Sequence, residues 1–316
     1  SRSGGDIYWR LLDPNGLPVW GPTFLDYDYQ IGTRTLATTG QYTLLLEGRY
    51  YTSGSVDYSF RVQPVVDDEL DLDLNTRYSG AVDHTGQRDL YNFTLTETKR
   101  IYFDSQGDNY YLRWQLSGPQ GMLVANQPLR DSDSADNRFI FDLIPGDYTL
   151  VLFGDNATTG AYAFRLLDLG SATAISTGAP ISGVLNPAVE TDAYQFTAQA
   201  GDRFFFDRTA VENYWTYWQL LDPWGRTVWG PTHMADNTSG DVDVTTLAFT
   251  GVYTLLIEGR YNAGQAQNAY SFNVSPSPVA EKIIISGLGS LPGPDLVVEQ
   301  LTVTPIGGTL AAGGQV

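Results

Sequence analysis

The chain has 316 residues, a length typical of about two domains. Its 18 Lys and Arg residues against 36 Asp and Glu residues give a formal net charge of −18, which argues against partners such as nucleic acid or anionic membranes. Cysteine is absent and only His84 and His233 are histidines, so disulfides, thiol chemistry and most His-dependent catalysis are excluded or disfavoured. Hydrophobic residues make up 42% of the chain, which predicts a folded protein. The sequence contains no run of about 18 apolar residues, the length that would predict a membrane-spanning helix.

Internal repetition organises the chain. Residues 8–23 read YWRLLDPNGLPVWGPT, and residues 217–232 read YWQLLDPWGRTVWGPT. The segment GQYTLLLEGRY, which ends at Tyr50, recurs as GVYTLLIEGRY, which ends at Tyr261. A weaker copy lies between them, and it aligns Trp9, Trp114 and Trp218 at spacings of 105 and 104 residues. This period predicts a series of small β-domains of about 105 residues each.

Apolar side chains alternate with period two in each copy, which is typical of half-buried β-strands. In chain order the expected strand cores are 42–46, 58–62, 91–95, 101–103, 148–152, 162–166, 194–196, 204–206, 253–257 and 270–274. Turns are expected at the Asp-Pro-Asn-Gly and Asp-Pro-Trp-Gly sequences of residues 13–16 and 222–225. No segment shows a clean helical stripe. The predicted fold class is therefore all-β, with tandem antiparallel β-sandwiches of about eight strands each.

The repeats predict four segments. Residues 1–64 form a partial first β-sandwich repeat whose leading strands are missing, and 65–168 and 169–278 form complete second and third repeats. Residues 279–316 form a linker and the opening strands of a following domain. Because the sequence starts at Ser1 without a Met or a signal peptide, we expect it to be a piece of a longer, processed chain. The acidic residues 66–75 are expected to form a charged edge strand or a linker.

The repeated pattern D-x-Y-x-F, W-x-L-x-x-P-x-G, G-x-Y-T-L and Y-x-F resembles the bacterial pre-peptidase C-terminal (PPC) domain family. The third copy carries it as Asp192, Tyr194, Phe196, Phe204–Asp207, Trp218, Leu220, Pro223, Gly225, Gly251, Tyr253, Leu255, Tyr270 and Phe272. The resemblance covers roughly residues 1–278 and implies jelly-roll-like sandwiches on secreted or cell-surface proteins, without catalytic residues. The tail sequence PDLVVEQLTVTP is similar to the opening strand of a bacterial cell-adhesion-related (CARDB-like) domain.

Acidic residues follow the Trp-Gly-Pro segment of the first and third copies and the equivalent place in the second copy. The first copy has Asp26 and Asp28 there, and the candidate calcium ligands of the other two are Asp131, Asp133, Asp136, Asp236, Asp241 and Asp243. Flexible Asp-rich loops supply the oxygen ligands that calcium prefers. The simpler interpretation is a charged, soluble edge of the sandwich, with no cofactor. The sequence leaves both interpretations open.

Nucleophilic catalysis is disfavoured. A catalytic triad needs a histidine close to a nucleophile and a carboxylate. His84 and His233 do not recur between copies, so we expect both to lie in solvated loops. We therefore predict that the protein is not an enzyme and has no catalytic residues.

The tryptophans divide into two groups. Trp9, Trp114 and Trp218 recur in phase with core positions and are expected in the core. Trp20 and Trp229 have no counterpart in the second copy, and Trp224 lies in a turn, so these three are the candidate ligand-binding residues. Exposed aromatic rings, including the pairs at 50–51 and 110–111, stack on sugars or contact protein partners.

Three functions remain open. The first is a non-catalytic extracellular repeat module, a structural or adhesive element of a large secreted or cell-surface bacterial protein. Its partners would be neighbouring repeats, copies of itself, a glycan or a surface protein. The second is a carbohydrate- or protein-binding accessory module of a secreted hydrolase. The third is a strand-exchanging subunit of an extracellular fibre, in which residues 283–304 complete the first sandwich of another molecule.

Overall fold

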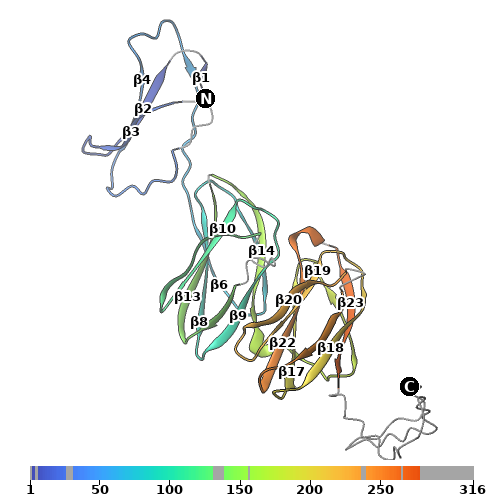
Figure 1. The fold of residues 1–316 in the computed structure, drawn as a ribbon. Helices are drawn as coiled ribbons and strands as arrows, with labels where there is room; N and C mark the ends of the chain where they lie inside the picture. The colour runs from blue at the N-terminus through green and yellow to red at the C-terminus, as the bar shows by residue number, and fades with distance from the viewer. Residues whose placement is uncertain are drawn as a thin grey trace, which may run out of the picture. The chain divides into compact units, whose positions relative to one another are not determined.

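The computed structural model describes residues 2–3, 6–25, 31–130, 139–155, 157–235, 240–264 and 266–277. Two compact units are present. The first comprises Ser1–Ala172, Leu185–Asp192 and Glu258–Gln267, and the second comprises Thr173–Val184, Ala193–Ile257 and Asn268–Val316. The sheets follow the sequence repeats (Figure 1).

The first repeat contains a small, open set of strands. Its elements are β1 (Arg2–Ser3), β2 (Ile7–Leu12), β3 (Pro18–Phe24), β4 (Thr43–Gly48) and β5 (Asp57–Tyr58). One sheet has the order β3-β2-β4, and β1 pairs with β5. Among the described residues of this repeat, the buried apolar side chains of the core are Ile7, Trp9 and Leu25, which is a small core for a sandwich.

The second repeat forms a closed sandwich. Its strands are β6 (Asp68–Asp71), β7 (Arg77–Val82), β8 (Arg88–Leu95), β9 (Lys99–Ser105), β10 (Leu112–Gly118), β11 (Gly121–Pro128), β12 (Ile140–Leu143), β13 (Gly146–Gly154) and β14 (Gly160–Asp168). The sheets have the orders β11-β10-β13-β8-β6 and β12-β9-β14-β7. Trp114 lies between them, stacked on Phe103 with ring centroids 3.8 Å apart.

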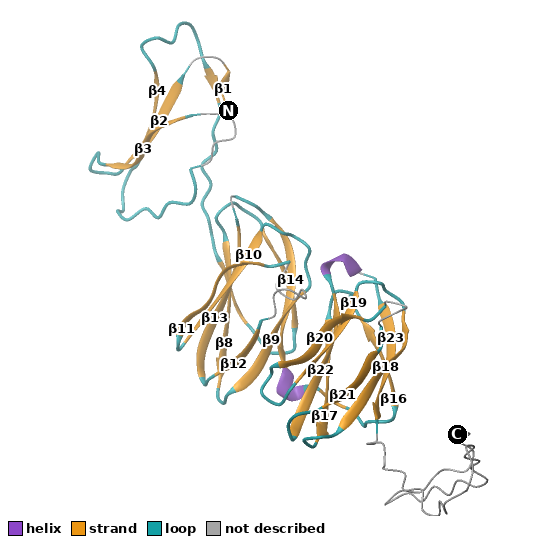
Figure 2. Ribbon diagram, viewed as in Figure 1, coloured by secondary structure: helices purple, strands orange, loops and turns teal. Residues whose placement is uncertain are grey.

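The third repeat has the same arrangement. Its strands are β15 (Thr173–Ala174), β16 (Pro180–Leu185), β17 (Thr191–Ala198), β18 (Arg203–Val211), β19 (Thr216–Leu221), β20 (Thr227–His233), β21 (Val242–Thr246), β22 (Gly251–Gly259) and β23 (Asn268–Pro276). The sheet orders are β15-β17-β22-β19-β20 and β16-β23-β18-β21. Two short 3-10 helices are also described, η1 (Leu169–Ser171) and η2 (Tyr261–Ala263) (Figure 2).

The predicted fold class is confirmed, with one correction of detail, a parallel strand pair in each complete repeat. Each of the two complete repeats has nine described strands, in agreement with the expected number of about eight. Each also has one parallel pair, because β6 lies parallel to β8 and β15 lies parallel to β17. The acidic segment 66–75 contains β6, whose four residues are all exposed, so it is a charged edge strand. Charged side chains on a sheet edge discourage pairing with other chains.

In each of the three repeats, a glycine packs closely against the proline of a turn. Gly40 has a φ of +149°, and a Cβ on it would lie 2.6 Å from Cγ of Pro14. Gly146 on Pro119 and Gly251 on Pro223 show the same close approach. Because only glycine lacks the Cβ and readily accepts this backbone angle, the first residue of the G-x-Y-T-L segment must be glycine to pack against the turn.

The tryptophans expected in the core lie there. Trp114 and Trp218 are fully buried, and Trp9 is 8% exposed in the smaller first repeat. Within the part of the chain that the structure describes, no helix is long and apolar enough to cross a membrane.

Candidate functional site: the open face of the first repeat

Strand β4 of the first repeat is equivalent to β13 of the second. Trp9 lies opposite Leu46 in the pairing of β2 with β4, as Trp114 lies opposite Leu152 in the pairing of β10 with β13. The far edge of β13 pairs with β8, and β22 pairs with β17 in the third repeat. Among the described residues, β4 ends its sheet and has no strand at that position. The first repeat is thus an open version of the other two.

Equivalent side chains of the first and second repeats differ in their exposure to solvent. Tyr58 and Phe60 are 51% and 45% exposed, whereas their counterparts Tyr162 and Phe164 are 4% and 0% exposed. The ring of Tyr58 stacks on that of Phe60 with centroids 6.3 Å apart. The Y-x-F segment, which faces the core in the complete repeats, therefore presents apolar surface to solvent in the first repeat.

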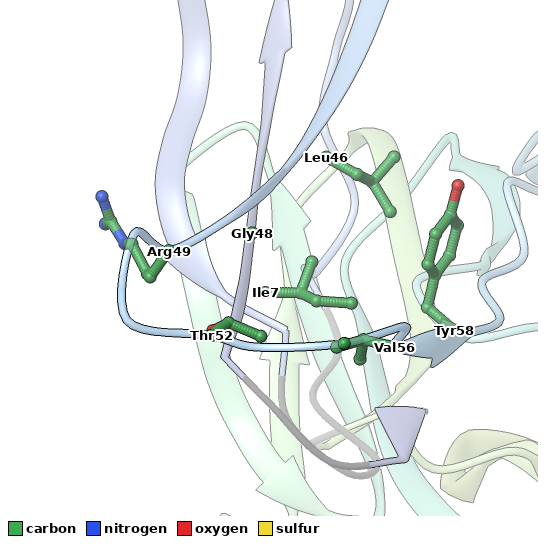
Figure 3. A pocket seen from close by; sticks show the side chains of 8 residues that line it. Ile7, Leu46, Gly48, Arg49, Thr52, Val56 and Tyr58 are labelled. Atoms are coloured by element: carbon green, nitrogen blue, oxygen red, sulfur yellow. The ribbon is translucent and has the colours of Figure 1, made fainter.

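A pocket of about 420 Å³ lies at this open face (Figure 3). Its lining residues come from β2, β4, β5 and the segment between β4 and β5: Ile7, Leu46, Gly48, Arg49, Thr52, Gly54, Val56 and Tyr58. The lining is mixed, because Ile7, Leu46 and Val56 are apolar while Arg49, Thr52 and Tyr58 carry polar groups. Thr52 Oγ1 accepts a hydrogen bond from the Asp6 backbone N–H at 3.2 Å, which ties the rim of the pocket to the start of β2.

The second repeat shows what the equivalent space holds when it is filled. Tyr162 on β14 donates a hydrogen bond to Oδ2 of Asp89 on β8, and its hydroxyl lies 2.9 Å from that of Tyr91. Gln87 Nε2 donates to the other carboxylate oxygen of Asp89 at 2.7 Å. Burial raises the pKa of Asp89 above its usual range, and it also raises the pKa values of Tyr91 and Tyr162. These residues form a buried polar junction between the two sheets.

The third repeat repeats the tyrosine part of this junction. The hydroxyls of Tyr194 and Tyr270 lie 2.6 Å apart in the interior, and Asp192 occupies the position equivalent to Asp89. A Cβ on Gly183 would lie 2.2 Å from the Tyr270 hydroxyl, as one on Gly80 would lie 2.5 Å from that of Tyr162. A glycine on the neighbouring strand therefore makes room for the paired hydroxyls in both complete repeats.

The sequence pattern predicted that these tyrosines lie in strands, but it did not predict the buried junction that their hydroxyls form. The available signal was the tyrosine shared by D-x-Y-x-F and Y-x-F in both complete repeats, since two buried hydroxyls need partners. Tyr58 is the member of this set that the first repeat supplies, and it lines the pocket.

Only two of the predicted calcium ligands lie among the residues that the structure describes. Asp131, Asp133, Asp136 and Asp236 lie outside the described residues, as do Asp26 and Asp28. Asp241 and Asp243 are exposed beside and on the edge strand β21, and Asp241 Oδ1 accepts a hydrogen bond from the Arg208 backbone N–H at 3.0 Å. In the described ranges, no group of three or more His, Asp or Glu side chains is arranged to hold a metal ion. The calcium hypothesis stays a prediction.

The three predicted ligand-binding tryptophans lie in different surroundings. Trp20 is half-buried and packs edge-on against Trp9, with centroids 5.0 Å apart. Trp229 is also half-buried and lies 4.9 Å from Phe206. Trp224 is 53% exposed in the turn before β20. The structure therefore places two of the three against the cores of their own repeats.

The histidines differ from each other. His84 lies in the loop before β8, where its backbone N–H donates to Gln87 Oε1 at 3.2 Å. His233 is the last residue of β20, and its ring lies 4.2 Å from that of Tyr214 and 4.6 Å from that of Tyr217. The expectation of a solvated loop is wrong for His233, because two tyrosine rings at the strand end cover it.

Comparison with known proteins identifies no family. No protein-family model matches the chain, and no curated protein matches it significantly. Among solved structures, the chain is similar to PliG, a periplasmic inhibitor of g-type lysozyme from Salmonella Typhimurium, with 18% identity, a TM-score of 0.23, and coverage of 33% of this chain and 98% of that one. It is also similar to the ANXUR2 extracellular domain from Arabidopsis thaliana, with 8% identity, a TM-score of 0.19, and coverage of 62% and 83%.

Proposed function

We propose that the protein is a non-catalytic extracellular repeat module, a structural or adhesive element of a large secreted or cell-surface bacterial protein, built from PPC-like repeats. One observation carries the proposal. The polar residues that recur in both complete repeats face the interior, where Tyr91 contacts Tyr162 and Tyr194 contacts Tyr270. Side chains used in this way join the two sheets of a sandwich rather than line a reaction site.

The charge and the packing support the same proposal. A net charge of −18 keeps a long repeat protein soluble and limits association with other acidic surfaces. The filled interiors of the second and third repeats, with Trp114 and Trp218 fully buried, are suited to units that must stay folded without disulfides.

Force spectroscopy on the full chain tests a structural role. We expect two abrupt unfolding events, each releasing about 35 nm of chain, because a repeat of roughly 105 residues extends by about 3.4 Å per residue. Trp114→Ala should lower the force of one event only, since it leaves a cavity in the second repeat alone. Gradual extension without discrete events would contradict a force-bearing role.

Exposed aromatic pairs favour a second candidate function, a carbohydrate- or protein-binding module. Tyr110 and Tyr111 are 41% and 57% exposed, and Tyr214 and Trp215 occupy the equivalent place with 61% and 37% exposure. In each pair the rings meet edge-on, with centroids 5.4 and 5.3 Å apart. Exposed rings held in a fixed arrangement at the same point of two repeats are suited to stacking on sugar rings or on a surface protein.

A glycan array separates the two candidates. The binding function predicts glycan signals that fall in the Trp215→Ala variant and remain in Leu17→Ala, which removes an exposed apolar side chain outside the pairs. Absence of binding, or equal loss in both variants, would leave the structural function as the better account. The donor role predicted for residues 283–304 concerns residues outside the described ranges.

A further inference from the structure

We propose that the third repeat binds an uncharged sugar ring on an exposed platform formed by Trp224, Arg226 and Phe249. Trp224 and Arg226 lie in the turn between β19 and β20, and Phe249 lies in the loop before β22. These three residues form the turn platform. The proposal goes beyond the structural role proposed above and does not depend on it. It also concerns a different place from the exposed pair of Tyr214 and Trp215.

The turn platform is an ordered arrangement of side chains at the surface. The rings of Trp224 and Phe249 meet edge-on, at an interplanar angle of 86° and with centroids 4.7 Å apart. Cζ of Arg226 lies 5.0 Å from the centroid of each ring, which is within the range of a cation–π contact. Trp224 is nevertheless 53% exposed and Phe249 is 37% exposed. Packing within the platform therefore leaves much of the indole in contact with solvent.

Two buried residues hold the platform in place. Oδ1 of Asp222 accepts hydrogen bonds from the backbone N–H groups of Trp224 at 2.9 Å and Arg226 at 3.0 Å. Oδ2 of the same carboxylate accepts one from Arg226 Nε at 2.7 Å. The hydroxyl of the fully buried Tyr253 donates to the Phe249 carbonyl at 2.9 Å and accepts the Phe249 backbone N–H at 3.1 Å. A site that is held in this way loses little conformational freedom when a ligand binds.

The fold does not require aromatic residues at these positions. In the first repeat, Asp13 accepts the backbone N–H groups of Asn15 at 2.9 Å and Leu17 at 2.8 Å, in the same Asp-Pro-x-Gly turn. The Tyr42 hydroxyl likewise bonds to the backbone of Thr38. The same scaffold thus forms with Asn, Leu and Thr where the third repeat has Trp, Arg and Phe. An exposed tryptophan and arginine that the turn does not need indicate contact with a partner.

The chemistry of the platform fits a sugar. A pyranose with equatorial hydroxyl groups presents an apolar face of C–H groups, which can stack on the exposed indole of Trp224. Arg226 is fixed through Nε by Asp222, and its side chain is 61% exposed. The N–H groups of its Nη1 and Nη2 atoms would then donate to two neighbouring hydroxyls of the same ring. One sugar thus meets an apolar surface and a pair of donors at the same point.

Charge and size favour an uncharged sugar over other partners. Asp222 forms an ion pair of 2.7 Å with Arg226, and the chain carries a net charge of −18, so an anionic ligand gains little at the platform. Three side chains cover far less than the roughly 800 Å² that each partner of a stable protein complex buries. A single sugar ring matches the size of the two aromatic side chains.

Binding is tested by fluorine NMR on the full chain labelled with 5-fluorotryptophan. The probes are cellohexaose and chitohexaose, two uncharged oligosaccharides with equatorial hydroxyl groups. The Trp224 resonance, assigned by its loss in Trp224→Asn, should shift saturably at millimolar sugar. A glucuronic acid hexamer with the linkage of cellohexaose should bind at least about tenfold more weakly, because each ring carries a carboxylate. No saturable shift with either uncharged probe, or an equal response to the acidic hexamer, would overturn the proposal.

Variants measured by isothermal titration calorimetry locate the site. Trp224→Asn and Arg226→Leu introduce the residues of the first repeat, and each should reduce affinity at least about tenfold, through loss of stacking or of charge-assisted hydrogen bonds. Arg226→Lys keeps the charge but loses the planar fork, so it should also bind more weakly. Val184→Ala removes a side chain of β16 that is 48% exposed, and it should bind like the wild type. Circular dichroism and melting curves establish that each variant is folded.

Trp215→Ala distinguishes this site from the exposed pair. Trp215 directly precedes β19, whereas Trp224 follows that strand. Loss of binding in Trp224→Asn with retention in Trp215→Ala is the expected result. The reverse result would assign the sugar to the pair and overturn the proposal. Because the unfolding forces of the repeats are measured without sugar, failure of the structural role and failure of this site are recognised separately.

Discussion

Tyr162 on β14 donates a hydrogen bond to the Asp89 carboxylate on β8, and this bond joins the two sheets of the second sandwich. The same tyrosine hydroxyl meets that of Tyr91, so three residues from distant parts of the repeat form one buried junction. A buried carboxylate costs free energy unless hydrogen bonds compensate it, and here Tyr162 and Gln87 both donate to it. The junction therefore defines a single register between strands that the apolar core alone would hold less specifically.

The Asp89 carboxyl should make the second repeat less stable as the pH rises. Burial raises the pKa of Asp89 above its ordinary value of 3.8, although hydrogen bonds from Tyr162 and Gln87 act in the opposite direction. The folded protein then holds this proton more tightly than the unfolded chain does. The stabilisation is fully present below pH 3.8 and is lost as the pH rises through the raised pKa. Asp89→Asn should remove this part of the pH dependence.

Urea denaturation between about pH 4 and pH 7 measures the effect, with 5-fluorotryptophan and fluorine NMR to follow Trp114, the one tryptophan of residues 65–168. Asp71→Asn, at an exposed residue of the edge strand β6, controls for the change in net charge. If Asp89→Asn retains the wild-type slope of stability against pH, the raised pKa is not coupled to folding.

Gly80→Ala should destabilise the second repeat by about 1–3 kcal/mol, the usual cost of overpacking an interior. Its Cβ would lie 2.5 Å from the Tyr162 hydroxyl and 2.7 Å from Cζ of the same ring. Gly107→Ala is a matched control in the same repeat, because its nearest neighbour would be the Ala163 backbone nitrogen at an ordinary 3.6 Å. Free energies of unfolding from urea titrations distinguish them. Equal values would show that the junction readily relaxes.

Arg165→Met should cost about 3–5 kcal/mol of stability at neutral pH, because it leaves a buried carboxylate without its cation. Asp104 is 0% exposed, and its Oδ2 accepts hydrogen bonds from Arg165 Nε at 3.0 Å and Gln106 Nε2 at 2.9 Å.

The loss in Arg165→Met should shrink as the pH falls, since burial raises the pKa of Asp104 and protonation removes the uncompensated charge. The Arg165→Met, Asp104→Asn double variant should recover part of the stability at neutral pH. Calorimetric melting of both variants checks this. A loss that does not depend on pH, together with no recovery in the double variant, would indicate that packing of the arginine stem matters more than its charge.

The charged-edge interpretation of the Asp-rich loops predicts that calcium does not change the melting temperature. Of the candidate ligands that the structure describes, Asp241 already accepts the Arg208 backbone N–H, and both Asp241 and Asp243 are exposed. Melting is compared in EDTA, in calcium and in magnesium at equal ionic strength. A melting temperature raised by calcium and not by magnesium would instead support the calcium hypothesis, since a ligand stabilises the state that binds it.

Individual residues show how much of the candidate site the sequence could predict. Tyr58 and Tyr162 stand in the same Y-x-F pattern, and the pattern alone predicts that both face the core. Yet one is 51% exposed and the other 4% exposed. The difference comes from β8, a strand far from β14 in the sequence, whose Tyr91 and Phe93 cover the second core. Likewise, the sequence around Trp20 and Trp229 does not predict that each ring packs on an aromatic ring of its own repeat.

The sequence by itself determined the all-β class, the period of the repeats and the core positions of the second and third repeats, because period-two alternation and turn residues are local signals that the chain carries in every copy. The tertiary structure decided the parallel edge strands and the Asp89 junction. These features depend on which strands meet across a sandwich. Local side-chain patterns indicate which residues face the core but do not specify strand order.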